Sequence, residues 1–587
     1  MFVHSKIAEI TENIIKNSVI SRDFYKKFIE TQKQNALSLK HHCTNLAHGC
    51  AVLSSAEKQS YIQPEHHNIG IITAYNDMLS AHHPFKDYPD MIKGYVSQHN
   101  MTAQVAGGVP AMCDGVTQGT ISMELSLFSR DIIAQSAAVG LSHNLFHGAI
   151  YLGVCDKIIP ALFIASMRFG HLPTLFLPAG PMGTGLSHEE KNHIRTQYAA
   201  GLLDEQDLLA SEMKAYHQAG TCTFYGTANS NQVLMEMAGL HLPGSTFLPP
   251  YSTQRQQSIQ EHLVFLKNMM ADKRTLADMI CEKTIVNMMI GLLATGGSTN
   301  LTIHLIAMAR AAGIVISWDD FAALSKIIPT IVSLYPSGKA DVNAFHKIGG
   351  VPYLVKNLLE YGLLQGDALT ITGNSLAQEH LNFCQNHDFP KNDTILRDVQ
   401  NPFKATGGIM VFDSVLGKGL MKISALKLPY TAFSAPAFVF HDQQDFKQAF
   451  QKGQLNQDCV VVLSYQGPRA CGMPELHQMM PALEVLQNRG HKVALLTDGR
   501  LSGASGKVPA LIHITPEAAG QGLIGAIATG DMIFLDWEQG ILTIESDFSK
   551  PFIQPILQQG MGRELFHLMQ KNISPATQGA SIFEYVD

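Results

Sequence analysis

The chain has 587 residues, too many for one ordinary hydrophobic core, so we expect at least two domains. Hydrophobic residues make up 46% of the chain and charged residues 16%, a globular composition that excludes intrinsic disorder. The formal net charge is −7, and no long run of Lys and Arg occurs. These features exclude a basic nucleic-acid-binding surface, so no nucleic-acid partner is expected.

The N-terminal residues lack the cationic start and the apolar run of a signal peptide. Apolar stretches such as residues 148–154 are too short to span a bilayer. We therefore predict a cytoplasmic protein with no membrane partner. The nine cysteines are odd in number and widely spaced, with no CxxC pair, which argues against a disulfide framework and against structural zinc. We expect most of them to be buried apolar residues, and a few to be ligands contributed by distant loops.

The first 60 residues predict amphipathic helices, because Ile7, Ile10 and Ile14 recur at helical spacing. Strands and helices then alternate, which predicts a parallel α/β sheet with polar motifs at the strand ends, where ligands bind in such sheets. The expected strands are residues 69–74, 149–154 and 174–177, and the expected helices are residues 124–142 and 161–167.

A helical stretch from about Thr284 to Ala312 is interrupted at residues 295–300. After about residue 385 the pattern changes to short β-rich segments separated by turns rich in Gly, Asp and Pro. Examples are residues 408–412, 437–440, 459–463 and 492–496. We predict an N-terminal parallel-sheet α/β domain over residues 1–385. A C-terminal, mostly β, barrel-like domain over residues 386–587 is expected to follow it and to end in a short helical tail.

Two loops place a cysteine directly before an aspartate. Cys113 precedes Asp114, and Cys155 precedes Asp156 and Lys157 after an apolar strand. Neighbouring loop residues can point in different directions, so Cys155 can face a soft iron site as a thiolate while Asp156 faces a hard cation. A packed cysteine beside a turn aspartate is the alternative for the first pair. Lys157 is either a counter-charge, which the sequence favours, or an oxygen ligand after carbamylation.

Two further segments contain candidate ligands. Cys222 lies in a loop rich in Gly, Thr and Asn, where it is either a ligand or an ordinary loop thiol. Pro474 fixes the backbone before Glu475, which helps that carboxylate to hold its position.

A glycine-rich loop, residues 497–507, follows a predicted strand and contains hydroxyl groups and two cations, Arg500 and Lys507. Backbone N–H groups and these cations can bind phosphate or another anion. The loop does not match the Walker pattern, and Ser502 lacks the GxSxG context of a hydrolase nucleophile.

Taken together, these loops resemble the dihydroxy-acid and 6-phosphogluconate dehydratase family, and the resemblance extends from about residue 40 to the end of the chain. Its motifs, in chain order, are Tyr75-Asn76-Asp77, Cys113-Asp114-Gly115, Cys155-Asp156-Lys157, Gly180-Pro181-Met182, Cys222 to Asn229, Gly296-Gly297-Ser298-Thr299-Asn300, Gly472-Met473-Pro474-Glu475 and Thr497-Asp498-Gly499-Arg500. Within the family, the chain is most similar to the branch that acts on 6-phosphogluconate.

The resemblance implies a lyase that converts 6-phospho-D-gluconate to 2-dehydro-3-deoxy-6-phospho-D-gluconate and water, the dehydration step of the Entner–Doudoroff pathway. It also implies a 4Fe-4S cluster, a homodimer and a C-terminal domain of the swivelling type. Two alternatives stay open. One is another dehydratase of this family, acting on a branched-chain dihydroxy acid or an unphosphorylated sugar acid. The other is a non-catalytic sugar-phosphate-binding protein.

The resemblance further implies cluster ligands. Cys155 and Cys222 match two ligand positions of the family. The dihydroxy-acid branch has a third cysteine where this chain has Ala81. Cys113 is therefore the expected third ligand, and Cys43 is the weaker candidate.

The remaining roles implied by the resemblance concern Mg²⁺, the base and the substrate. Ser502 matches the family's proposed base, and we expect Arg500 and Lys507 to neutralise part of the charge of the anionic, phosphorylated substrate. The magnesium ligands of the dihydroxy-acid branch match Asp114, Asp156, Lys157 as a carbamate, and Glu475.

Overall fold

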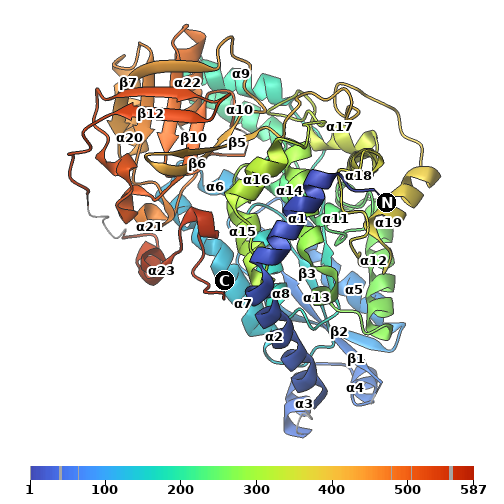
Figure 1. Cartoon of the computed structure of the whole chain (residues 1–587). Helices are drawn as coiled ribbons and strands as arrows, with labels where there is room; N and C mark the ends of the chain where they lie inside the picture. Colours follow the sequence, from blue (N-terminus) through green and yellow to red (C-terminus); the bar gives the residue numbers. More distant parts are fainter. Residues whose placement is uncertain are drawn as a thin grey trace.

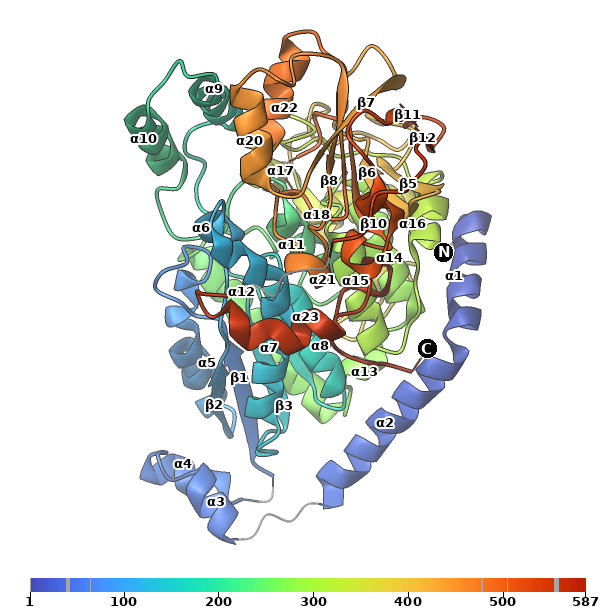
Figure 2. The same ribbon diagram turned by 90° about the vertical axis from the view of Figure 1, so that its left-hand side faces the viewer.

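The computed structural model describes residues 2–38, 43–63, 65–476, 479–503, 505–553 and 559–586. A four-stranded parallel sheet surrounded by helices forms the N-terminal part, and an eight-stranded mixed sheet forms the C-terminal part. Figures 1 and 2 show the C-terminal sheet above the helical layer that covers the parallel sheet. The predicted fold, an α/β domain followed by a mostly β domain, is confirmed.

The parallel sheet has the strand order β2-β1-β3-β4, with β1 (His67–Thr73), β2 (Met101–Gly108), β3 (Gly148–Leu152) and β4 (Thr174–Leu177). Three of these strands agree with the predicted ones, because β1, β3 and β4 are nearly continuous buried apolar runs. Strand β2 was not predicted from the sequence. It is an edge strand whose second half is partly exposed and ends in two glycines, so it lacks a clear apolar pattern.

Helices cover the parallel sheet, and the most apolar of them lie inside the molecule. Almost every residue of α8, α14 and α15 is buried, as expected for helices that are apolar on all sides. The predicted helical stretch with an interruption at residues 295–300 is confirmed as α14 and α15. The helices of this part are α1 (Ser5–Asn17), α2 (Val19–Ser38), α3 (Cys43–Gly49), α4 (Ser55–Tyr61), α5 (Tyr88–Ser97), α6 (Asp114–Thr117), α7 (Ser126–Leu141), α8 (Ile158–Arg168), α9 (His188–Ala199), α10 (Glu205–Ala215), α11 (Thr227–Met237), α12 (Thr253–Ala271), α13 (Leu276–Met279), α14 (Glu282–Ala294), α15 (Leu301–Ala311), α16 (Trp318–Ser325), α17 (Val342–Lys347), α18 (Gly350–Glu360) and α19 (Leu376–Asn386).

The C-terminal sheet has the order β12-β11-β7-β8-β9-β10-β6-β5, and its edge strands β12 and β5 contact each other, so the sheet is nearly closed. Strands β7 to β10 are parallel, which requires crossover connections. Helices α20 and α22 lie in two of these connections. The elements are β5 (Ile409–Ser414), β6 (Gly417–Lys422), β7 (Ala432–Phe440), α20 (Gln443–Gln451), β8 (Cys459–Leu463), α21 (Pro468–Cys471), α22 (Met479–Asn488), β9 (Val493–Thr497), β10 (Ala510–Thr515), β11 (Met532–Asp536), β12 (Ile541–Glu545) and α23 (His567–Asn572).

The connection between the two parts has no helix or strand between the end of α19 at Asn386 and the start of β5 at Ile409. The division into residues 1–385 and 386–587 stays a prediction. The end of the chain returns to the N-terminal part, because Ile573 and Ala580 belong to the same apolar cluster as the parallel sheet. Within the described residues, no helix has both the length and the apolar character needed to cross a membrane.

A buried ion pair on α7 holds this returning segment. Arg130 lies 2.9 Å from Asp131, and both side chains are almost fully buried. The guanidinium donates hydrogen bonds to the carbonyl oxygens of Gly579 and Ala580, at 2.9 and 2.6 Å. Asp131 accepts a hydrogen bond from the backbone N–H of Ile582 at 2.8 Å. The C-terminal segment is therefore fixed to α7 by charge-assisted hydrogen bonds.

We predict that Arg130→Met releases this segment, because it leaves the Asp131 carboxylate and two carbonyl oxygens buried without their partner. The loss should be about 3–5 kcal/mol of local stability, measured by hydrogen exchange of residues 573–586 and by their susceptibility to proteolysis. Lys571→Met, which removes an exposed cation from α23, is the control and should change neither. Unchanged protection in Arg130→Met would contradict the role of this ion pair.

Candidate active site

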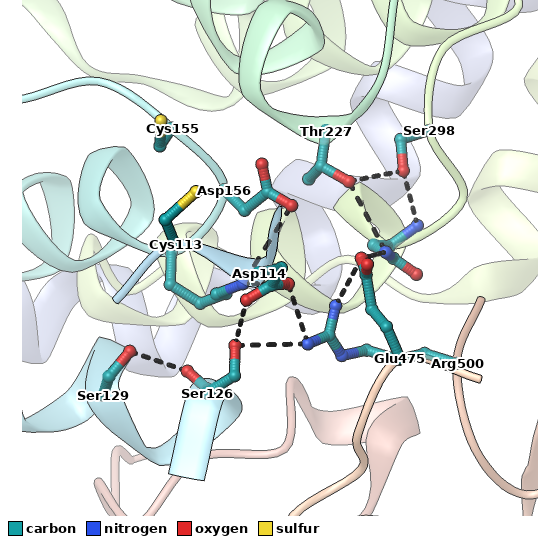
Figure 3. A network of polar contacts seen from close by, with 12 residues as sticks. Cys113, Asp114, Ser126, Ser129, Cys155, Asp156, Thr227, Ser298, Glu475 and Arg500 are labelled. Carbon is teal, nitrogen blue, oxygen red and sulfur yellow. Dashed lines mark hydrogen bonds and ion pairs between the residues drawn. The ribbon is translucent and has the colours of Figure 1, made fainter. Parts of the chain in front are cut away.

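Three carboxylates from distant parts of the chain converge beneath the C-terminal sheet. Oxygens of Asp114, Asp156 and Glu475 lie within 4.8 Å of one another (Figure 3). Asp114 begins α6, Asp156 follows the carboxyl end of β3, and Glu475 follows α21. Ligands bind at the carboxyl ends of parallel strands, so the position of Asp156 agrees with the site expected from the sequence.

Two cations lie among these carboxylates. Lys157 is fully buried and forms an ion pair with Asp114, and its Nζ lies 4.0 Å from Asp156. Arg500, also buried, places Nη2 3.0 Å from Asp114 and Nη1 2.8 Å from Glu475. Its Nε donates to the carbonyl oxygen of Met473 at 2.8 Å. Protein groups thus engage all three nitrogens of the guanidinium.

This arrangement shifts the pKa of each of the three carboxyl groups. Burial raises the pKa of Asp114, but Lys157 and Arg500 outweigh it and hold that pKa well below its usual range. For Glu475, burial and the neighbouring Asp114 charge raise the pKa to about 8. Burial also raises the pKa of Asp156. Three acidic groups share two basic ones, so an additional cation would be stabilised here.

Three thiols lie beside the carboxylates. Burial raises the pKa of Cys155, and Cys113, Asp156 and Cys222 raise it further through their negative charges. Burial, followed by the charge of Cys113, raises the pKa of Cys222 to about 12. Each of these thiols thus lies close enough to another to shift its pKa. Figure 3 shows Cys113 and Cys155 on the side of the carboxylates opposite Arg500.

The other cysteine considered as a third ligand lies elsewhere. Cys43 is exposed on α3, which Figures 1 and 2 show at the far end of the molecule from α6. Ala81 is buried, and the carbonyl oxygen of the preceding Ser80 accepts a hydrogen bond from Gly220 at 2.8 Å. The loop that contains Ala81 therefore lies beside the loop that contains Cys222.

The donor groups fit the cofactors that the sequence implies. Sulfur ligands from three separate loops suit an iron–sulfur cluster, and a group of carboxylate oxygens suits Mg²⁺. Burial raises the pKa of all three thiols, so coordination to iron would offset the cost of forming thiolates there. The chemistry of the site therefore supports both groups.

Helix α11 holds the backbone of the loops that contain Cys155 and Cys222, a role that was not predicted from the sequence. The Asn231 side chain donates to the carbonyl oxygens of Cys155 and Asp156, at 3.2 and 2.9 Å. The Asn229 side chain donates to the carbonyl oxygen of Cys222 at 2.6 Å. The run of polar residues 229–232 in a buried helix was the available signal, because buried polar side chains need partners.

A second group of polar residues connects the two parts of the molecule. Asn300, just before α15, donates to the carbonyl oxygen of Leu501 at 2.9 Å and lies 3.5 Å from Glu475. Thr227 and Ser298 share a hydrogen bond of 2.8 Å (Figure 3). The residues between α14 and α15 thus contact both the start of α11 and the loop that follows β9.

The predicted base and substrate residues belong to the loop that follows β9. Ser502 is partly buried and lines a pocket with Thr299 from the α14–α15 connection and Ile512 of β10. Arg500 lies inside the carboxylate group, whereas Lys507 forms an ion pair of 3.0 Å with Glu484 of α22. The structure thus brings Arg500 together with the predicted metal ligands and gives Lys507 a separate partner.

Comparison with known proteins agrees with this arrangement. Residues 66–379 match the N-terminal part of the dihydroxy-acid/6-phosphogluconate dehydratase family, and residues 394–580 match its C-terminal part. Two relatives named phosphogluconate dehydratase, from Zymomonas mobilis and Pseudomonas aeruginosa, are each 45% identical, with 98% and 99%, respectively, of both chains covered. A third of that name, from Escherichia coli, is 46% identical over 99% of this chain and 100% of its own. The chain therefore belongs to the dihydroxy-acid/6-phosphogluconate dehydratase family.

Proposed function

We propose that this protein is a hydro-lyase that dehydrates 6-phospho-D-gluconate to 2-dehydro-3-deoxy-6-phospho-D-gluconate, the dehydration step of the Entner–Doudoroff pathway. The supporting observation is the grouping of three carboxylates with Cys113 and Cys155 beside them (Figure 3), where Asp114 and Glu475 pair with Arg500, two residues before Ser502. Near-full-length relatives named phosphogluconate dehydratase support the choice of substrate. The reaction removes a proton from C2 and hydroxide from C3, and the enol that forms becomes the 2-keto acid.

The cofactors we propose are a 4Fe-4S cluster held by Cys113, Cys155 and Cys222, and a Mg²⁺ ion. The ion would be held by Asp114, Asp156 and Glu475, with Lys157 as a further oxygen ligand if its amine is carbamylated. When bound, these groups supply a Lewis acid for the C3 hydroxyl and positive charge for the oxygens of the substrate carboxylate.

We assign removal of the C2 proton to Ser502. A free hydroxyl is a weak base, so its alkoxide must be stabilised by nearby positive charge. Arg500 lies two residues before Ser502, and the hydrogen bond from Asn300 to Leu501 fixes the backbone between them. Arg500 keeps Asp114 and Glu475 in place, and together with Lys507 it is proposed to neutralise part of the charge of the substrate.

We propose that the protein is a cytoplasmic homodimer. Cysteine ligands must stay reduced, which requires a reducing compartment such as the cytoplasm. Exposed apolar side chains support self-association, because large groups of them mark interaction surfaces. Val19, Ile20 and Phe24 of α2 are 54–69% exposed, and Leu565 and Leu568 near the C-terminus are 82% and 75% exposed.

The proposed substrate is tested by comparing initial rates on three compounds with protein purified without oxygen. We expect kcat/KM to be at least about tenfold higher for 6-phospho-D-gluconate than for D-gluconate or a branched-chain 2,3-dihydroxy acid, because a lost charge-assisted contact costs about 1.5–3 kcal/mol. A higher kcat/KM on either of the other compounds would contradict the proposed substrate. Absence of turnover on all three, with iron and sulfide present, would contradict the proposed enzyme.

For the cluster ligands, we predict that Cys113→Ser, Cys155→Ser and Cys222→Ser each lose the brown iron–sulfur absorbance and most of the bound iron, because a serine hydroxyl is a poor ligand for iron. The matched control is Cys43→Ser, an exposed cysteine on α3, which should keep both. Full iron content in Cys113→Ser together with loss in Cys43→Ser would reverse the assignment of the third ligand.

For the base, Ser502→Ala should lower kcat by about 10²–10⁴-fold, the usual contribution of a positioned base, while iron content and absorbance stay at the wild-type level. Ser434→Ala, in the exposed face of β7, is the control and should keep wild-type turnover. A kcat within about twofold of wild type in Ser502→Ala would exclude Ser502 as the base.

A further inference from the structure

The pocket beside Ser502 has one wall that the mechanism above does not use. Lys422, the last residue of β6, lines this pocket together with Ala510 and Ile512 of β10 and with six residues that follow β9, which are Leu501, Ser502, Gly503, Ser505, Gly506 and Val508. Register pairing within the sheet places Lys422 beside Ile409 of β5. A cation thus lines the same pocket as the proposed base.

The amine of Lys422 is buried and has no hydrogen-bond partner among the described residues. The residue is only 8% exposed. Burial alone lowers its pKa, to about 8, and no carboxylate opposes the effect. An isolated buried ammonium group is costly, and proteins normally pair such a group with an anion. Lys422 is therefore poised to bind an anion that enters the pocket.

The backbone near Ser502 lies against this side chain. Gly506 has φ of +144°, which favours glycine, and a Cβ at that position would lie 3.5 Å from Cδ of Lys422, at ordinary van der Waals distance. The backbone N–H of Ser505 donates a hydrogen bond to the carbonyl oxygen of Ser502 at 2.9 Å, which holds these two residues close together. Backbone N–H groups of such loops can bind anions.

The other cations near the site already have anionic partners. Lys157 pairs with Asp114, and Arg500 pairs with Asp114 and Glu475. Lys507 pairs with Glu484. Of these four cations, Lys422 is the one for which the described structure contains no ion pair. Its charge is therefore available to a substrate without breaking an existing contact.

We propose that Lys422, together with Ser502, Gly503, Ser505 and Gly506, is the subsite for the phosphate group of the substrate. This inference rests on the proposed function. The substrate has two anionic groups, and the carboxylate adjoins C2, so it must lie near Ser502 and the cation bound by Asp114, Asp156 and Glu475. The second anionic group, the phosphate at the other end of the substrate, can then bind Lys422. It is a dianion, which pairs strongly with an ammonium group.

The test compares Lys422→Met with Lys422→Arg, and with Lys418→Met as the matched control. Lys418 lies on the same strand and forms an ion pair of 2.5 Å with Asp319 outside the pocket. KM and kcat are measured with 6-phospho-D-gluconate. Binding of inorganic phosphate is measured separately, as the rise in melting temperature that it causes, so that one readout does not depend on turnover.

We expect Lys422→Met to raise KM by about 10–100-fold, the value of one charge-assisted contact, with kcat nearly unchanged. Phosphate should no longer raise its melting temperature. Without phosphate, this variant should melt at a higher temperature than wild type, because it removes an unpaired buried charge. Lys422→Arg should keep most of the affinity for phosphate, and Lys418→Met should behave as wild type.

If Lys422 had a purely structural role, its replacement would not change KM or the binding of phosphate. Wild-type KM and wild-type phosphate stabilisation in Lys422→Met would overturn the proposal, whatever its melting temperature. Failure of both Lys422→Met and Lys422→Gln to fold would also overturn it, because the charge would then be required by the fold. If wild-type protein did not turn over 6-phospho-D-gluconate, the proposed function would fail, while the phosphate measurement would still decide whether Lys422 binds phosphate.

Discussion

The contacts of Arg500 are the interaction on which the rest of the site depends. Its guanidinium joins Asp114 of the N-terminal part to Glu475 of the C-terminal part, and these two residues are 361 positions apart in the chain. Neither side chain has access to much solvent. A buried ion pair of this kind gains little net stability, because desolvation offsets most of the attraction. Its consequence is geometric, since it fixes how closely the two parts approach at the site.

The fold supplies the remaining constraints through strand ends and amide side chains. Cys155 and Asp156 follow the carboxyl end of β3, and the loop that contains Arg500 and Ser502 follows β9. Asn231 then holds the first of these loops by its carbonyl groups. A thiol and a carboxylate can therefore occupy adjacent positions in the sequence and still point in different directions, because the loop is held by its backbone.

Much of this arrangement follows from local patterns in the sequence. The apolar runs of β1, β3, β8 and β9 predict buried strands, and the polar residues that follow them predict the position of the site. The edge strand β2 was missed because its alternation is weak. The contact between Asp114 and Arg500 could not be derived, because it depends on how segments that are separate in the sequence pack together. The partner of Lys507 was missed for the same reason, since Glu484 belongs to a helix that precedes it by a complete strand.

The balance of charge in the site supports the role proposed for Lys422 in binding the phosphate group. Three carboxyl groups and two cations leave the candidate metal site with an excess of acidic groups, yet the proposed substrate is itself an anion. A bound divalent cation can reverse the sign of the potential near the substrate carboxylate. Its influence on a phosphate four carbons away from C2 is weaker, because the attraction between charges falls with distance. A second positive charge at that end of the pocket must come from the protein. Lys422 meets this requirement, because its position in the sheet buries its charge without a partner until an anion enters.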